Sequence, residues 1–212
     1  MSVSNIVLAG GPGAGKTTVL ELLKTFPRKD NAHLIFLDEA ASKILRTFPK
    51  LHRISPELFQ ATILGTQLGM NQIVERGFDN VICISDRGIY DLWAYIDDQD
   101  KFCEITGFAP YLSLPTYDLV IYLESLDSFV GLANNLYRKE ESIHQVKEVE
   151  AKTRQAWESR VVAREFVVVP TCNLIQDKAR LVAAAINKHL GRDVFDLKKG
   201  EVANESDQKR SV

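Results

Sequence analysis

Short apolar runs alternate with longer amphipathic segments along most of the chain. This alternation is typical of repeated strand–helix units, in which helices cover both faces of a parallel sheet. The runs are rich in Val, Ile and Leu and continuously apolar, as strands buried on both faces tend to be. They predict five parallel strands side by side, at Asn5–Ala9, His33–Leu37, Asn80–Ser85, Tyr117–Leu123 and Glu165–Val169.

The segments between these runs predict the covering helices. A first helix is expected at Lys16–Lys24, and the longest at Pro56–Glu75, with Ser55 as N-cap and Pro56 at the first helical position. Apolar positions at helical spacing indicate two more helices. These positions are Ile143, Val146, Val149, Thr153 and Trp157 in one, and Ile175, Ala179, Val182, Ile186 and Leu190 in the other.

The C-terminal residues lose this pattern and carry charges of both signs. Such a segment cannot bury enough apolar surface to offset the entropy of ordering it. We therefore expect one domain at residues 1–190 and a flexible polar tail at residues 191–212. No internal repeat or interdomain linker is evident.

Composition narrows the class of partner. Hydrophobic residues make up 45% of the chain and charged residues 25%, the net charge is −2 and the pI is about 6.1. These values argue against a broad basic surface for nucleic acid and favour a small-molecule partner. No apolar stretch approaches the length of a membrane span, and three scattered cysteines fit a reducing, cytoplasmic setting.

The most specific motif is the stretch Gly10–Thr17, which fits GxxxxGK[ST] between a predicted strand and a predicted helix. Its glycines let backbone amides turn inward toward phosphate oxygens, and the following helix N-terminus favours negative charge. An incidental glycine-rich turn is a poor alternative, because strand, spacing and helix all agree. The motif predicts binding of ATP or GTP with Mg²⁺, through Gly11, Pro12, Gly13, Ala14, Gly15, Lys16, Thr17 and Thr18.

Within that motif, Lys16 is expected to bridge the terminal phosphates. The Thr17 hydroxyl can bind the magnesium ion, while Thr18 is placed to contact a phosphate nearer the base.

Two predicted strand ends carry carboxylates, where an open parallel sheet binds its ligands. Asp86 follows the third strand and is our candidate for the magnesium side, with Arg87 beside it. Asp38 and Glu39 follow the second strand, and either could accept a proton from a substrate hydroxyl. The alternatives are a helix N-cap at Asp86 and first-turn acids of a helix to about Phe48.

The phosphate loop, Asp38-Glu39-Ala40-Ala41 and Ser85-Asp86-Arg87-Gly88 together resemble the P-loop nucleoside and nucleotide kinases. More closely, residues 3–190 resemble the AAA-type ATPase/kinase-like domains related to the ribosylnicotinamide kinase part of bacterial NAD regulators. The resemblance implies a three-layer α/β/α fold, an acceptor contact or base at Glu39, and an Asp86-Arg87 pair serving magnesium and phosphate. Relatives often place an arginine three residues after the carboxylate, where this chain has Ser42.

Amide side chains form a stripe on the long helix, at Gln60, Gln67 and Asn71. In P-loop nucleoside kinases a helix at this place lines the acceptor pocket, which makes Gln60 and Gln67 candidates for substrate binding. An ordinary solvated helix face accounts for the stripe equally well.

The same resemblance suggests a lid between the fourth and fifth strands, with Arg138 as the candidate that stabilises the transferring phosphate. Lys139 and Arg154 are its alternates. After the fifth strand, Thr171 and Asn173 are candidates for holding the nucleotide base.

The sequence therefore favours a phosphotransferase that moves the γ-phosphate of ATP or GTP to a small hydroxyl- or phosphate-bearing acceptor. The competing hypothesis is a regulatory nucleotide-binding protein with weak hydrolysis, whose nucleotide state controls a partner.

Overall fold

A computed structural model describes residues 3–96, 99–107, 117–125, 143–158 and 163–198. Its centre is a five-stranded, all-parallel sheet with the strand order β2-β3-β1-β4-β5. This confirms the predicted fold class, and the predicted strand boundaries agree to within two residues. The strands are β1 (Val3–Ala9), β2 (His33–Leu37), β3 (Val81–Asp86), β4 (Tyr117–Leu123) and β5 (Ala163–Val169).

The helices follow the predicted order, with three short additions. The predicted helices are found as α1 (Lys16–Thr25), α4 (Pro56–Gly77), α6 (Ile143–Glu158) and α7 (Ile175–Leu190), and the segment after β2 forms α2 (Ala40–Thr47). Ser55 occupies the N-cap position of α4, but its side chain makes no capping hydrogen bond. The additions are α3 (Leu51–Ile54), the 3₁₀ helix η1 (Ile89–Ala94) and α5 (Gln99–Thr106).

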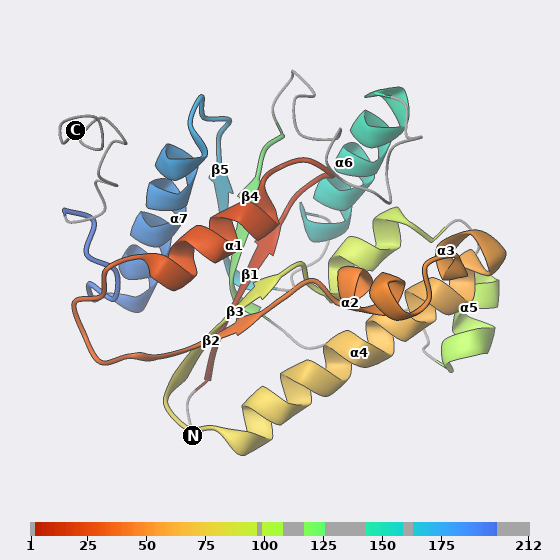
Figure 1. The fold of residues 1–212 in the computed structure, drawn as a ribbon, viewed down its shortest axis with the longest axis horizontal. Coiled ribbons are helices and arrows are strands. Elements are labelled where there is room, and N and C mark those ends of the chain that lie inside the picture. Colours follow the sequence, from red (N-terminus) through yellow and green to blue (C-terminus); the bar gives the residue numbers. More distant parts are fainter. Residues whose placement is uncertain (1–2, 97–98, 108–116, 126–142, 159–162, 199–212) are drawn as a thin grey trace, which may run out of the picture.

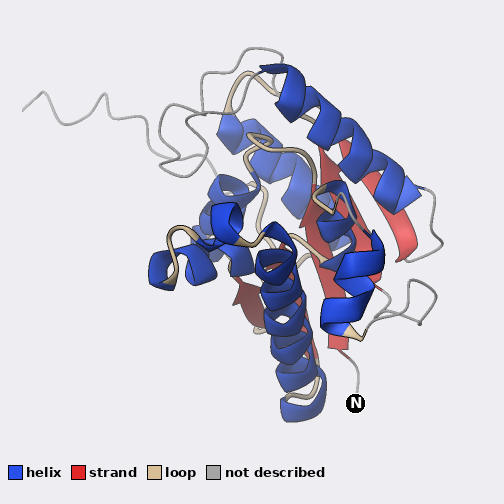
Figure 2. Ribbon diagram, turned by 90° about the vertical axis from the view of Figure 1, so that its right-hand side faces the viewer, coloured by secondary structure: helices blue, strands red, loops and turns tan. Residues whose placement is uncertain are grey.

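The side chains of β1 show why the domain has three layers. Successive strand residues point to opposite faces, so Ile6 and Leu8 enter one buried cluster with α1 and α7, while Val7 and Ala9 enter another. The second cluster takes residues from α4, η1, α5 and α6. The sheet accordingly lies between α1 and α7 on one side and the other large helices on the opposite side (Figure 1). Figure 2 looks onto that second layer, with the strands behind it.

The predicted boundary at Gly191 is too early. Val194 and Phe195 are fully buried in the cluster that includes α1 and α7. The Asn187 side-chain oxygen accepts hydrogen bonds from both of their backbone N–H groups, and Phe195 pairs with Arg28 in an isolated antiparallel bridge. Two apolar side chains with a satisfied backbone are enough to order a segment whose charge pattern looks like that of a tail.

The remainder of the predicted tail, residues 199–212, lies outside the described residues. None of the helices in the described ranges is both long enough and apolar enough to cross a membrane.

Candidate active site

The phosphate loop connects β1 to α1 in a tightly packed turn. Gly10 has φ +139°, and a Cβ atom at this position would lie 2.4 Å from the Leu123 carbonyl oxygen at the end of β4. A Cβ at Gly11 would lie 2.7 Å from that of Glu150 on α6. No larger residue fits these two positions without displacing backbone, which explains the glycines of the motif.

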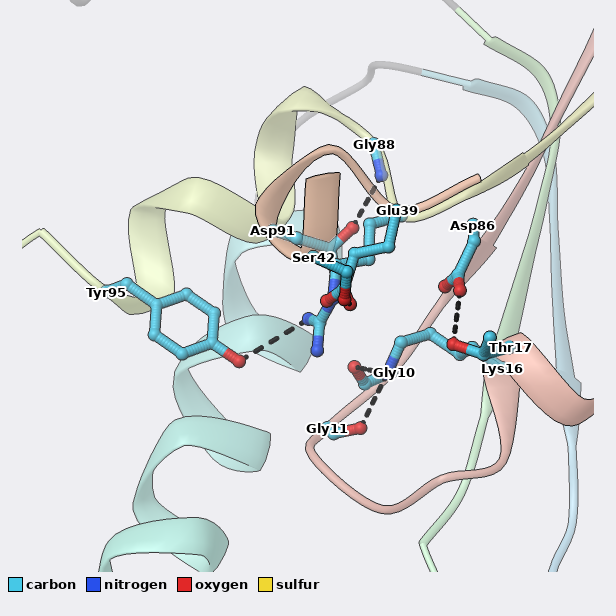
Figure 3. A network of polar contacts seen from close by, with 11 residues as sticks. Gly10, Gly11, Lys16, Thr17, Glu39, Ser42, Asp86, Gly88, Asp91 and Tyr95 are labelled. Carbon is cyan, nitrogen blue, oxygen red and sulfur yellow. Dashed lines mark hydrogen bonds and ion pairs between the residues drawn. The ribbon is translucent and has the colours of Figure 1, made fainter. Parts of the chain in front are cut away.

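Lys16 lies inside this loop. It is buried, and its ammonium donates to the carbonyls of Gly10 at 2.8 Å and Gly11 at 2.7 Å (Figure 3). Thr17 and Thr18 follow on the first turn of α1 and are exposed. The predicted phosphate-binding residues are therefore contiguous in space, with a positive charge held at their centre.

Asp86, the last residue of β3, reaches this loop from the neighbouring strand. Its Oδ2 accepts a hydrogen bond from the Thr17 hydroxyl at 2.5 Å (Figure 3). The side chain is 1% exposed, and its Oδ1 has no hydrogen-bond partner among the described residues. Burial raises the pKa of Asp86, while the charge of Lys16 opposes that rise. A buried carboxylate oxygen without a donor, beside a threonine hydroxyl, is a donor set that fits a magnesium ion.

The turn after β3 holds Arg87 in an unusual backbone conformation, with φ +72°. Each N–H of this turn has an acceptor: Arg87 donates to Leu8 O, Gly88 to Asp91 Oδ2 at 2.8 Å, and Ile89 to the Tyr117 hydroxyl at 3.0 Å. Non-glycine residues in the left-handed region cost free energy and persist only where the surroundings enforce them. These hydrogen bonds supply that enforcement and direct the Arg87 side chain.

Arg87 and Glu39 meet across the ends of β3 and β2. The Nε of Arg87 donates to Glu39 Oε1 at 2.6 Å, and the Ser42 hydroxyl donates to Glu39 Oε2 at 2.5 Å. A terminal nitrogen of Arg87 lies 3.4 Å from the Tyr95 hydroxyl. Ser42, which stands where the family resemblance implied an arginine, thus orients the carboxylate of Glu39.

Asp38 has a different environment from its neighbour Glu39. Its side chain is 51% exposed and pairs with Lys24 at 2.8 Å and Lys43 at 3.8 Å. The hydrogen bond from Lys24 holds the pKa of Asp38 below its usual value. α2 begins at Ala40, so neither acid lies in its first turn and the alternative of first-turn helix acids is wrong.

A pocket of about 240 Å³ opens beside the Glu39–Arg87 pair. Its lining combines apolar side chains with carboxylate, guanidinium, imidazole, phenol and amide groups. Gln60 and Gln67 line it from α4 and are only 7% and 4% exposed, so a solvated outer helix face is the wrong interpretation of that stripe. The pocket is lined by Glu39, Ala40, Ala41, Leu45, His52, Pro56, Phe59, Gln60, Ile63, Gln67, Arg87, Gly88, Asp91, Leu92 and Tyr95.

Three polar lining residues escaped the sequence interpretation: His52, Asp91 and Tyr95. Asp91 is buried, and burial raises its pKa against the opposing charges of Arg87 and Lys16. Asp91 could have been predicted from the sequence, because it lies five residues after Asp86 at the end of β3. A tight turn at that point brings a residue at this spacing back to the same edge of the sheet. The positions of His52 and Tyr95 depend on α3 and η1, which no sequence pattern indicated.

Other candidates lie away from this cluster. Thr171 and Asn173 are exposed in the loop between β5 and α7 and do not line the pocket. Arg138 and Lys139 lie outside the described residues. Arg154 lies on α6, where it forms ion pairs with Glu158 at 2.8 Å and Glu124 at 3.5 Å.

Comparisons with known proteins agree with this fold. Two solved structures of deoxyadenosine kinase from M. mycoides superpose on 86% of this chain and 98% of their own. The form with the products dCMP and a flexible dCDP bound has a TM-score of 0.65 and 16% identity, and the dCTP-bound form 0.63 and 14%. At such identities the likeness establishes a shared P-loop kinase fold.

A comparison with curated proteins finds no significant match. The family model of the AAA domain, in contrast, matches residues 5–177, most of the chain from β1 to the start of α7. The phosphate loop, the strand order of the sheet and the match to the family model lead to the same conclusion. The chain belongs to this AAA domain family of P-loop proteins.

Proposed function

We propose that this protein transfers the γ-phosphate of ATP or GTP to the hydroxyl of a small acceptor that binds in the pocket beside Glu39 and Arg87. The observation that carries the proposal is the Arg87–Glu39 pair of 2.6 Å, which lines this pocket and comes from two strand ends next to the phosphate loop. A protein that only binds or hydrolyses a triphosphate does not need a second pocket, lined by a paired carboxylate, beside its phosphate loop. The deoxyadenosine kinases that share the fold are themselves phosphotransferases, which supports the assignment.

In this proposal the donor lies in the phosphate loop. Backbone N–H groups of Gly11 and of residues 13–16 would surround its phosphates, and the Lys16 ammonium would move from the Gly10 and Gly11 carbonyls to the terminal phosphate oxygens. Thr17 and Asp86 would hold magnesium, for which Asp86 Oδ1 offers a buried oxygen without a donor. When bound, magnesium neutralises charge on the phosphate oxygens.

Glu39 is the proposed base. The Arg87 guanidinium holds one carboxylate oxygen and the Ser42 hydroxyl holds the other, so the group is oriented before the acceptor arrives. A hydroxyl of the acceptor within hydrogen-bond reach of Glu39 would lose its proton to that carboxylate as it attacks. Asp38 is left out of this role because its carboxylate is exposed and paired with Lys24.

Charge favours an uncharged hydroxyl acceptor over a phosphate-bearing one. Among the described lining residues, Glu39 and Asp91 supply two carboxylates, whereas Arg87 is the only lysine or arginine and is already paired. A phosphate monoester dianion would therefore meet net negative charge. Gln60 Oε1 is buried without a partner in the described structure, so the acceptor is expected to bring a hydrogen-bond donor to it.

A thermal-shift screen tests the proposal. Nucleosides, matched nucleoside monophosphates and other hydroxyl metabolites are added to the protein with magnesium and a non-hydrolysable ATP or GTP analogue. A ligand that binds only the native state raises the melting temperature by mass action. We expect stabilisation by an uncharged compound and transfer of labelled γ-phosphate to it.

Two outcomes would contradict the proposal. Stabilisation by nucleoside monophosphates alone would reverse the charge argument. Stabilisation by ATP or GTP with no acceptor found, slow hydrolysis and a nucleotide-dependent protein partner would instead support the regulatory hypothesis.

A further inference from the structure

A second lysine, besides Lys16, is buried against the phosphate loop. Lys178 lies in the first turn of α7 and is 2% exposed. Its ammonium donates to the carbonyl of Ala14 in the loop at 3.2 Å and to the carbonyl of Glu124, just after β4, at 2.8 Å. One side chain therefore joins three segments that are distant in sequence.

The contacts around Lys178 show that this junction is close-packed. Ile175, one turn earlier on α7, would be 2.7 Å from a Cβ atom placed at Gly15. The N–H of Glu124 donates to Val169 O, which ties the end of β4 to the end of β5. Lys178 thus connects the phosphate loop to the hydrogen-bonded ends of β4 and β5.

Stability alone explains this lysine poorly. Among the described residues its ammonium donates to two neutral carbonyls and forms no ion pair, and the Glu124 and Glu150 carboxylates act on it only through their charge. A buried ammonium with only neutral partners loses hydration that such contacts replace incompletely, and burial lowers the pKa of Lys178. A lysine at a buried position where an apolar side chain could pack is better explained by a function of the loop.

Peptide geometry identifies that function. The Ala14 carbonyl and the Gly15 N–H belong to one planar trans peptide, so they point in opposite directions. Because the carbonyl is held toward Lys178, the Gly15 N–H points away from the Lys178 ammonium. The positive charge behind the carbonyl also polarises this peptide and strengthens the N–H as a donor.

We infer that Lys178 is a positioning residue for the phosphate donor: it orients the Ala14–Gly15 peptide toward the phosphates and adds positive charge behind the loop. The inference rests on the proposed binding of a triphosphate in this loop, but it does not depend on transfer to an acceptor.

Direct binding measurements test the role. The dissociation constants of Mg·ATP and of magnesium tripolyphosphate are measured by calorimetry for the wild type, Lys178→Met and Lys178→Gln. Lys188→Met is the matched control, because Lys188 is exposed near the end of the same helix. We expect Lys178→Met to weaken both ligands about tenfold or more, Lys178→Gln to recover part of the loss through its amide donor, and the control to bind as the wild type does.

The outcomes separate this role from a merely structural one. A lysine that only supports the fold would change the melting temperature of the ligand-free protein and leave both dissociation constants unchanged, which would overturn the inference. The inference would also be overturned if Lys178→Met weakened the binding of an acceptor found in the screen as much as it weakened the binding of Mg·ATP. If the wild type binds Mg·ATP but transfers no phosphate, the proposed function fails while the role of Lys178 can still be measured.

If neither variant folds, the wild type provides the test. The ¹⁵N-labelled ammonium of Lys178 should exchange slowly with water because it is buried, and its resonance should shift when magnesium tripolyphosphate binds. The slowly exchanging lysine resonances of this chain are expected from the two buried lysines of the described region, Lys16 and Lys178. If the Lys16 resonance shifts and the Lys178 resonance does not, the inference is overturned.

Discussion

The Nε of Arg87 and the Oε1 of Glu39 lie 2.6 Å apart, joining the ends of β3 and β2 beside the phosphate loop. Both side chains are mostly buried. Removing either partner would leave the other as an unpaired charge in a poorly solvated place, so the pair is expected to act as a unit.

This pair leads to a prediction about the proposed base. Glu39→Gln keeps the shape of the side chain but removes its basicity, and we expect kcat to fall by about 10²–10⁴-fold, the usual contribution of a general base. Asp38→Asn is the matched control, because its 51% exposed side chain pairs only at the surface. Steady-state kinetics with the acceptor identified by the screen provide the measurement, and equal turnover in the wild type and Glu39→Gln would remove Glu39 from the mechanism.

Asp86 is expected to determine the magnesium dependence of triphosphate binding. In the wild type, ATP should raise the melting temperature more with magnesium than with EDTA, since ion and nucleotide bind the native state together. Asp86→Asn loses the carboxylate at Thr17 and should lose that difference. Asp79→Asn, at an exposed position just before β3, should retain it. A full magnesium effect in Asp86→Asn would show that another group holds the ion.

Phe195 is expected to contribute substantially to stability although it lies beyond the last helix. It is fully buried and meets Phe26 edge to face, with the ring centroids 6.1 Å apart. Truncating a buried Phe to Ala typically costs about 3–5 kcal/mol, and urea unfolding of Phe195→Ala should show a loss of this size. Leu197→Ala, two residues later and 37% exposed, should cost much less. Similar losses for both would argue against a packed C-terminal segment.

Two glycines should respond oppositely to alanine. Gly65 lies within α4, is exposed and has no atom within 4 Å of an added Cβ, so Gly65→Ala should stabilise the protein by about 0.5–1 kcal/mol through helix propensity. Gly11→Ala would bring its Cβ within 2.7 Å of Glu150 and should both destabilise the protein and weaken ATP binding. Melting curves with and without Mg·ATP measure both effects, and a stabilised Gly11→Ala would contradict the close approach of α6 to the loop.

Cys83 should be the least reactive thiol. It is buried in β3, and burial raises its pKa to about 11, whereas Cys103 and Cys172 are partly accessible. Because the thiolate is the reactive form, labelling of the native protein at pH 8 should modify two of the three thiols and reach the third only after unfolding. Rapid labelling of all three in the native state would contradict this.

The same thiol predicts a dependence of stability on pH. An acid whose pKa is higher in the folded state ionises more readily when unfolded. The contribution of the Cys83 thiol to stability is therefore fully present at pH values below its ordinary pKa of 9.0. It is lost as the pH rises toward the folded-state pKa of about 11. In Cys83→Ala this part of the decline in the free energy of unfolding should be absent.

Local patterns were sufficient for the elements that depend on neighbours in sequence. The apolar runs, the helical spacing and the glycine motif specify β1, α1 and the loop between them because strand burial, amphipathicity and backbone freedom are properties of short segments. The carboxylates at the strand ends could also be predicted, since parallel strands bring their carboxyl ends to one edge.

The choice between Asp38 and Glu39 was beyond such reasoning. The two acids are adjacent in sequence, and only the positions of Lys24 on α1 and Arg87 after β3 decide which faces the pocket. The burial of Gln60 and Gln67 likewise depends on the pocket that α2, α4 and η1 form together.

By itself, the sequence determined the sheet, its covering helices and a phosphate loop with acids at neighbouring strand ends, because each follows from local periodicity or a contiguous motif. Tertiary structure alone decided which acid is paired with Arg87, that residues 192–196 pack onto the domain, and that Lys178 holds the loop carbonyl of Ala14. The physical reason is that charge pairing and burial depend on side chains brought together from distant segments, and no local pattern encodes which segments meet.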